Sequence, residues 1–302
     1  MVDNEFDELR PSAFAIAYRM LGSVSEAEDV VQEGFLRLHR VRESGERIES
    51  PRAYLSTVVA RLSIDQLRSA RVRRETYVGE WLPEPLVASA DDDPARKAEM
   101  ADSLSLAFLV LLESLSPEQR AAFLLHEVFD EPYERVAEII ATSEENARQL
   151  VSRARRHVEE RRPRFEVSRE QQEQLATRFF AAAEGGHLEA LEELLAHDVV
   201  LHGDGGGKAP AIVRAIHGRA RVARTLIAGL RTAIRAGVSL RREEVNGQPG
   251  ALFFDREGRV AGVMILDVAD GQIQGVSSID NPDKLGHLGP VADLRALLRE
   301  RR

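Results

Sequence analysis

Apolar residues recur every three or four positions through the first 60 residues, which is the spacing of amphipathic helices. The stripes cover residues 6–21, 27–38 and 54–62 and predict three packed helices. Ser25 and Glu28 form a capping-box pair before the second stripe. The polar residues on the outer face of the second helix are Asp29, Gln32, Glu33 and Arg37. The pattern alone favours a solvated surface there.

A helix-turn-helix pattern follows later in the chain. Ser116 with Gln119 caps its first helix, the second begins near Pro132, and Thr142 with Glu145 caps the third. Side chains on the polar face of such a third helix read base edges in the major groove, although helical hairpins of bundles share the pattern. Here that face carries Glu145, Arg148, Gln149, Ser152, Arg153 and Arg156.

Residues 75–93, between these helical regions, have the composition of a linker, with two prolines and an acidic run. A helix is expected over residues 94–115. Trp81 is the only tryptophan of the chain, and we expect it to dock on a domain surface, since an exposed indole in a linker would be unfavourable.

Glycine is unevenly distributed, which indicates a change of fold class. Of 21 glycines, only Gly22, Gly34, Gly45 and Gly79 precede residue 169. Behind that point, two amphipathic helices interrupted by glycines at 185 and 186 are followed by a third helix and four alternating strands. These strands are expected at residues 238–245, 250–256, 259–269 and 272–280, and they imply an α+β domain behind two all-α ones.

Charge and composition narrow the function. The net charge of −9 hides two basic strips, with five arginines against one acid in residues 61–74 and seven against two in residues 148–164. The chain has no cysteine, no apolar leader and no long apolar run, so we expect a cytoplasmic protein without disulfides, metal or cofactor. The first strip contains Arg61, Asp65, Arg68, Arg71, Arg73 and Arg74, which suit phosphate contacts or decorate a surface.

The stretch LHGDGGGKAP, residues 201–210, suggests a phosphate-binding loop at first sight. Such a loop needs a first glycine where this chain has His202 and a hydroxyl where it has Ala209. The nucleotide-binding hypothesis is therefore rejected.

Three stretches together resemble the sigma factors of bacterial RNA polymerase. AIAYRMLGSVSEAEDVVQEGFLRLHR is similar to regions 2.1 and 2.2, residues 50–74 to regions 2.3 and 2.4, and residues 116–162 to region 4. Because nothing large separates them, the resemblance is to the compact extracytoplasmic function (ECF) group. It implies domains at residues 1–75, 94–164 and 168–302, with a linker at 76–93.

The resemblance also assigns roles to the polar faces. The D-x-x-Q-E pattern of Asp29, Gln32 and Glu33, with Arg37, implies contact with the β′ clamp helices of core RNA polymerase, and region 4 implies contact with the β flap. The arginine-rich strip would recognise the promoter −10 element, and the third helix of the helix-turn-helix would read the −35 element.

The C-terminal half resembles the SnoaL-like domain, a cone of the NTF2 and ketosteroid isomerase type. In such cones an acid or histidine can act as general base, and His202, Asp204 and Asp267 are the candidates here. Two alternative hypotheses stay open beside that of a non-catalytic domain. The domain could be an active isomerase-like or cyclase-like enzyme, or the chain could be a ligand-responsive helix-turn-helix regulator. A small apolar ligand in the cone is a further expectation.

The order WLPEP, DGGGK and NPDKL is similar to the ECF subgroup with a fused SnoaL-like extension. The resemblance implies that this extension contacts the sigma core in cis and replaces a separate anti-sigma factor, whether it inhibits, activates or does both. The expected contact residues are Trp81, Asp204, Gly205, Gly206, Gly207, Lys208, Asn281, Pro282, Asp283 and Lys284.

Overall fold

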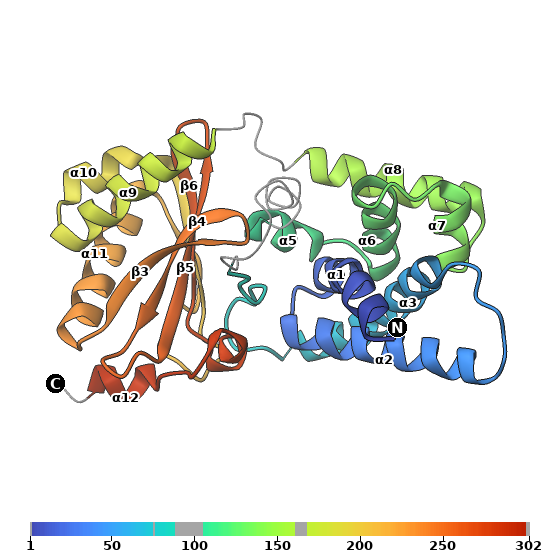
Figure 1. Ribbon diagram of the computed structural model, residues 1–302. Coiled ribbons are helices and arrows are strands. Elements are labelled where there is room, and N and C mark those ends of the chain that lie inside the picture. Colours follow the sequence, from blue (N-terminus) through green and yellow to red (C-terminus); the bar gives the residue numbers. More distant parts are fainter. Residues whose placement is uncertain (1, 75, 88–104, 161–167, 300–302) are drawn as a thin grey trace. The chain divides into compact units, whose positions relative to one another are not determined.

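The computed structural model describes residues 2–74, 76–87, 105–160 and 168–299, with the backbone alone for residues 2–5 and 70–74. They form two compact units (Figure 1). The first unit comprises Met1–Thr76 and Leu109–Arg162, and the second comprises Tyr77–Phe108 and Pro163–Arg302. The segment between the two helical regions therefore belongs to the second unit. No helix within the described ranges is long and apolar enough to cross a membrane.

The first unit is all-α, as the apolar stripes predict. Its N-terminal helices are α1 (Val2–Leu21), α2 (Val24–Glu43) and α3 (Pro51–Arg74). They are followed by α5 (Leu106–Leu112), α6 (Pro117–Phe123), the π-helical turn η1 (Leu124–Val128), α7 (Tyr133–Ile139) and α8 (Glu144–Glu159). Helix α5 begins in the second unit and ends in the first. The rest of the helix expected over residues 94–115 lies largely outside the described residues.

Two helices are capped one or two residues away from the predicted cap. Helix α2 is capped by Ser23, whose hydroxyl accepts the Glu26 backbone N–H at 3.2 Å, and the prediction of Ser25 was wrong. Both serines stand three residues before a glutamate, but the chain turns at Gly22 (φ 64°), which places Ser23 first. Helix α8 is capped by Ser143, one residue after the predicted Thr142.

The second unit is an α+β domain built on one sheet. Its helices are α9 (Arg169–Gly185), α10 (Leu188–Leu194), α11 (Arg219–Arg235) and α12 (Leu294–Arg299), with 3-10 turns η2 (Pro282–Lys284) and η3 (Gly286–Leu288). Its strands are β1 (Leu195–Asp204), β2 (Ile216–His217), β3 (Ser239–Val245), β4 (Gln248–Phe254), β5 (Val260–Ala269) and β6 (Gln272–Ile279). The four predicted strands are confirmed, whereas β1 and β2 were not foreseen.

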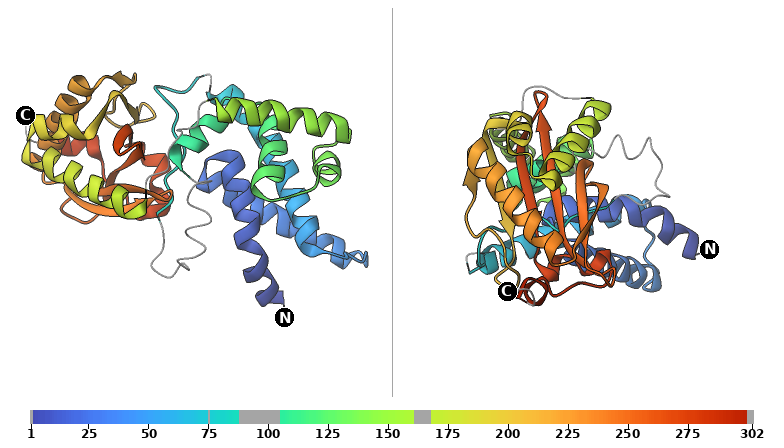
Figure 2. Two further views of the ribbon diagram at one scale, coloured as in Figure 1. Left: turned by 90° about the horizontal axis from the view of Figure 1, so that it is seen from above. Right: turned by 90° about the vertical axis from the view of Figure 1, so that its left-hand side faces the viewer.

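The sheet has the order β2-β1-β6-β5-β4-β3, in which β1 and β6 are parallel and all other neighbours antiparallel. Helices α9 to α11 lie on one side of it (Figure 1), and Figure 2 shows the same unit from two further directions. Along β5, Met264 and Leu266 face the helices, while Val263 and Ile265 join a second apolar cluster on the other face. Because successive side chains of a strand alternate, β5 is buried on both sides.

The second cluster is completed by residues from outside the sheet domain's own sequence. Leu82 from the linker and Leu106 from the start of α5 pack against the face of the sheet that α9 to α11 leave uncovered. Leu82 of the linker, with Val87 packed beside it, is thus part of the core of the C-terminal domain.

Candidate functional site

The outer face of α2 is available for a partner. Asp29 and Gln32 are exposed, while Ala27, Val30 and Val31 form the buried stripe. Arg37 donates a hydrogen bond to Glu33 at 2.8 Å, which lowers the pKa of the Glu33 carboxyl. The face therefore presents a carboxylate pair and an amide.

Arginines of α3 contact the helix-turn-helix region inside the first unit. Arg61 donates from Nε to the Ile139 carbonyl at 3.0 Å and from Nη2 to the Glu138 carbonyl at 2.7 Å, at the C-terminal end of α7. Positive charge is favourable at that end of a helix. Arg68 pairs with Glu118 of α6 at 2.8 Å.

Two arginines of the helix-turn-helix region donate to the N-terminal helices, Arg135 to α3 and Arg120 to α1. Arg135 donates to the Ala53 carbonyl at 2.9 Å and to the Thr57 hydroxyl at 2.6 Å, both on α3. Arg120 is buried and donates to the Met20 carbonyl at 2.7 Å, and burial lowers its pKa to about 9. The predicted −10 residue Asp65 stays exposed beside Arg68, and the side chains of Arg71, Arg73 and Arg74 lie outside the described residues.

The predicted reading face of α8 is solvent-exposed along its length. Ala147, Val151, Ala154 and Val158 are buried, as the apolar stripe predicts. The exposed side is made by Glu145, Arg148, Gln149, Ser152, Arg153 and Arg156. Arg148 pairs with Glu144 and lies over the Tyr133 ring, with its guanidinium carbon 4.5 Å from the ring centroid.

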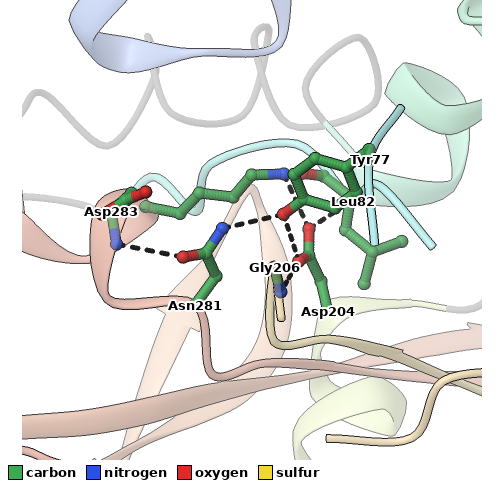
Figure 3. Close-up of polar contacts among 7 residues, drawn as sticks. Tyr77, Leu82, Asp204, Gly206, Asn281 and Asp283 are labelled. Carbon is green, nitrogen blue, oxygen red and sulfur yellow. Dashed lines mark hydrogen bonds and ion pairs between the residues drawn. The ribbon is translucent and has the colours of Figure 1, made fainter. Parts of the chain in front are cut away.

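A buried carboxylate at the end of β1 holds the linker. Asp204 is fully buried and accepts hydrogen bonds from the Tyr77 hydroxyl at 2.5 Å and the Leu82 backbone N–H at 2.9 Å (Figure 3). Lys284 donates to the same carboxylate at 2.7 Å, and the Gly206 backbone N–H also donates to it, at 3.1 Å. We call Tyr77, Leu82, Asp204, Asn281 and Lys284 the linker clamp.

The remaining members of the linker clamp complete its hydrogen bonds. Asn281 donates from its side chain to the Tyr77 hydroxyl at 2.7 Å, and burial together with the Asp204 carboxylate raises the pKa of that phenol. Lys284 also donates to the Leu82 carbonyl and lies 4.1 Å from the centroid of the Trp81 ring. Lys284 and Asp204 form a buried ion pair, and removal of either partner would leave an uncompensated buried charge. The pair therefore keeps the two side chains in this arrangement.

The glycine loop after β1 packs against this clamp. Gly206 has φ 55°, and a Cβ there would overlap the Asn281 side chain. A Cβ on Gly207 would lie 3.2 Å from Val78 of the linker. Lys208 pairs with Asp283, and both side chains are more than half exposed, at 58% and 60%. The structure thus brings the glycine loop and the linker together. Of the two ion pairs at this loop, Lys208–Asp283 is exposed and Lys284–Asp204 is buried.

Further anchors of the linker were not foreseen from the sequence. The Leu86 backbone N–H donates to the Asn246 side chain at 2.9 Å, and the Asn246 backbone N–H donates to the Leu86 carbonyl at 2.7 Å. At the entry to α5, the Leu106 backbone N–H donates to Gln248 at 2.9 Å. Asn246 lies in a hairpin turn with φ 53°. The Asn-Gly pair in the sequence indicates such a turn but not a contact with the linker.

Comparison with known proteins gives the family. Models of sigma-70 region 2, sigma-70 region 4 and the SnoaL-like domain match residues 6–73, 105–158 and 176–276. The ECF RNA polymerase sigma factor SigJ of Mycobacterium tuberculosis H37Rv is 40% identical, covering 97% of this chain and 96% of the relative. This chain belongs to the ECF sigma factors. Probable ECF RNA polymerase sigma factor SigI of the same species is 34% identical to it over 90% of the chain and 91% of the relative.

The fold agrees with this assignment. The crystal structure of SigJ matches with a TM-score of 0.76 and 37% identity, covering 94% of this chain and 98% of that one. The ECF sigma factor described here therefore carries region 2 in α1 to α3, region 4 in α5 to α8 and a SnoaL-like domain in the second unit. As a sigma factor it binds core RNA polymerase and promoter DNA.

A cavity of about 680 Å³ lies in the sigma factor's SnoaL-like domain, between α11, the sheet and α12. The lining residues do not include His202, Asp204 or Asp267, the three candidates for a general base. His202 pairs instead with Glu80 of the linker at 3.0 Å, and Asp204 holds the linker clamp. The acid that lines the cavity is Asp280, one residue beyond β6, and burial raises its pKa to about 7.

We expect Asp280 to make the stability of the sigma factor fall as pH rises from about 4 to about 7. The folded state holds the carboxyl proton up to a pKa of about 7, above the ordinary value of 3.8, so the unfolded state releases it first. Asp280→Asn removes this dependence. Between pH 5 and pH 7 we expect the free energy of unfolding, measured with urea, to fall by about 2 kcal/mol more in the wild type than in the variant. This loss stays below the limit of about 1.4 kcal/mol per pH unit because the carboxyl faces a cavity. Parallel pH profiles would contradict this.

Proposed function

We propose that this sigma factor is controlled in cis by its SnoaL-like domain, which holds the segment between regions 2 and 4 and replaces a separate anti-sigma factor. The domain has no catalytic role in this proposal. The observation that carries it is the buried Asp204, which binds Tyr77 and Leu82 of that segment directly.

Attachment at both ends of the segment supports the proposal. Asp204 holds the chain just after region 2, at Tyr77, and Gln248 holds it at Leu106, close to the start of the region 4 match. A free stretch of residues 77–87 spans at most roughly 36–40 Å when extended, and this reach is lost when the stretch is held. A shorter effective tether raises the local concentration of region 4 at region 2.

The contacts within the first unit indicate what this tether favours. Arg61 and Arg68, assigned to the −10 element, are engaged by region 4 through Ile139 and Glu118. An arginine already paired with protein must exchange that partner for phosphate or a base edge. We therefore propose that the described arrangement is a restrained one, which opens when the sigma factor engages promoter DNA.

The functional surfaces follow from the same proposal. The α2 face of Asp29, Gln32, Glu33 and Arg37 binds the β′ clamp helices, and region 4 also binds the β flap. Region 2 reads the −10 element, and the exposed α8 face reads the −35 element. The proposed domain limits are residues 1–75, 94–164 and 168–302, joined by the linker 76–93.

Loosening region 4 from α3 should increase promoter-dependent transcription. Glu118→Ala with Arg135→Ala removes the region 4 partners of Arg68 and Thr57 without changing a proposed DNA contact. We expect run-off transcription with core polymerase, on a promoter recovered by selection, to rise about tenfold, which corresponds to about 1.4 kcal/mol of lost restraint. Glu134→Ala, an exposed change on α7, serves as the control and should leave transcription unchanged.

Lower transcription from the Glu118→Ala/Arg135→Ala variant, with its fold intact by circular dichroism, would contradict the restrained arrangement. Failure of the wild type and of a truncation ending near residue 207 on every selected promoter would contradict the proposed promoter activity itself.

A further inference from the structure

The cavity in the SnoaL-like domain has the size and lining of a small-molecule site. Its volume of about 680 Å³ lies within the usual range of roughly 300–1,000 Å³ for ligand pockets. Its floor is the sheet, one wall is α11, and the short α12 closes another side. The apolar lining includes Leu201, Ile212, Leu226, Phe253, Met264 and Leu294.

The polar groups of the lining are few, and most are already engaged. The hydroxyls of Thr225 and Thr232 donate to backbone carbonyls of α11 at 2.8 Å and 2.7 Å. Arg224 is exposed on the same helix. Asp280 differs from these, because its carboxyl accepts a single hydrogen bond among the described residues, from the Ser278 hydroxyl at 3.0 Å.

The sheet makes room for this carboxyl. A Cβ on Gly262 of β5 would lie 2.5 Å from Oδ1 of Asp280, so the carboxyl rests where any other residue would place its side chain. Desolvation raises the pKa of Asp280 to about 7, as expected for a carboxyl without a cationic partner. A hydrogen-bond donor that enters the cavity would supply the missing partner.

We propose that this cavity binds an apolar molecule with one hydroxyl or amine group, which donates a hydrogen bond to the Asp280 carboxyl. The apolar body lies against Phe253 and Met264, and acids of the same size are disfavoured because their carboxylate meets that of Asp280. The Asp280 backbone N–H also donates to the Asp204 carbonyl at 2.8 Å, next to the linker clamp. An effect of the ligand on the linker rests on the proposed function, whereas binding itself does not.

The test uses the full chain with N-phenyl-1-naphthylamine, an apolar fluorescent probe that carries one N–H donor. We expect a saturable increase in its fluorescence at pH 7.5. Competition by 1-decanol and 1-decylamine is expected at concentrations about tenfold lower than by decanoate, and Asp280→Asn should reduce this difference to about threefold or less while the probe still binds. Decanoate competing as well as the alcohol and amine with the wild type would overturn the proposal.

Two substitutions on α11 locate the binding. Gly229 lines the cavity, and a Cβ there meets no atom within 4 Å, so Gly229→Phe fills the cavity without a clash at its first atom. Ile234→Phe places the same ring on the exposed surface of the helix. The first variant should lose at least about tenfold in probe affinity and the second should keep it, with both folds checked by circular dichroism. Unchanged probe binding by Gly229→Phe, or no saturable binding by the wild type, would overturn the proposal.

Discussion

Asp204→Asn is expected to lower the free energy of unfolding of the SnoaL-like unit by about 3–5 kcal/mol. The change leaves the Lys284 ammonium, whose side chain is 7% exposed, without its carboxylate partner. It also weakens the acceptor for the Tyr77 hydroxyl and the Leu82 backbone N–H. Urea unfolding followed by the fluorescence of Trp81 measures the loss, because this tryptophan is the only one in the chain and lies beside Lys284.

Lys208→Ala is the matched control, since it breaks an ion pair of the same loop in solvent. The Lys208 and Asp283 side chains are 58% and 60% exposed, and such surface pairs contribute about 0–1 kcal/mol. We expect Trp81 emission to shift to longer wavelength in Asp204→Asn and to stay unchanged in Lys208→Ala. Equal losses of stability from the two variants would show that the buried carboxylate does not hold the linker.

Gln32→Ala with Glu33→Ala is expected to abolish co-purification with core RNA polymerase, with at least about a hundredfold loss of affinity, or about 2.7 kcal/mol. Both side chains lie on the outer face of α2, and the buried stripe of that helix is untouched. The loss would therefore report a missing contact with the polymerase. Co-purification and run-off transcription measure it.

Arg40→Ala with Glu43→Ala changes two exposed residues nearer the end of the same helix and should leave core binding intact. Retained core binding by the Gln32→Ala/Glu33→Ala variant would place the polymerase contact elsewhere. Specific promoter binding by the wild type without core polymerase would instead favour a ligand-responsive helix-turn-helix regulator.

The secondary structure was predictable where one period dominated. The strands β3 to β6 alternate between two apolar clusters, and Asn246-Gly247 and Asp270-Gly271 adopt the positive φ values that hairpin turns require. Two helix caps were predicted wrongly, because two hydroxyl residues compete for each of them, Ser23 with Ser25 and Thr142 with Ser143. Strand β1 was missed because its residues follow α10 without a turn signal.

The sites were predictable only as far as local motifs reach. Asp204 and Lys284 were selected with their motifs, but the sequence could not show that they pair with each other, 80 positions apart, while Lys208 pairs in solvent. The contact of Arg61 with the end of α7 spans 78 positions and has no local signal. Asp280 resembled the end of an ordinary strand, and the space over Gly262 that accommodates it appears only in the folded sheet.

The most direct test of linker control is run-off transcription by core polymerase on one selected promoter, with the wild type, Asp204→Asn and Lys208→Ala compared at equal concentration. Release of the linker should raise transcription by Asp204→Asn about tenfold, while Lys208→Ala stays within about twofold of the wild type. Transcription by Asp204→Asn equal to or below that of the wild type, with Trp81 reporting a released linker and the sigma regions folded, would contradict the account.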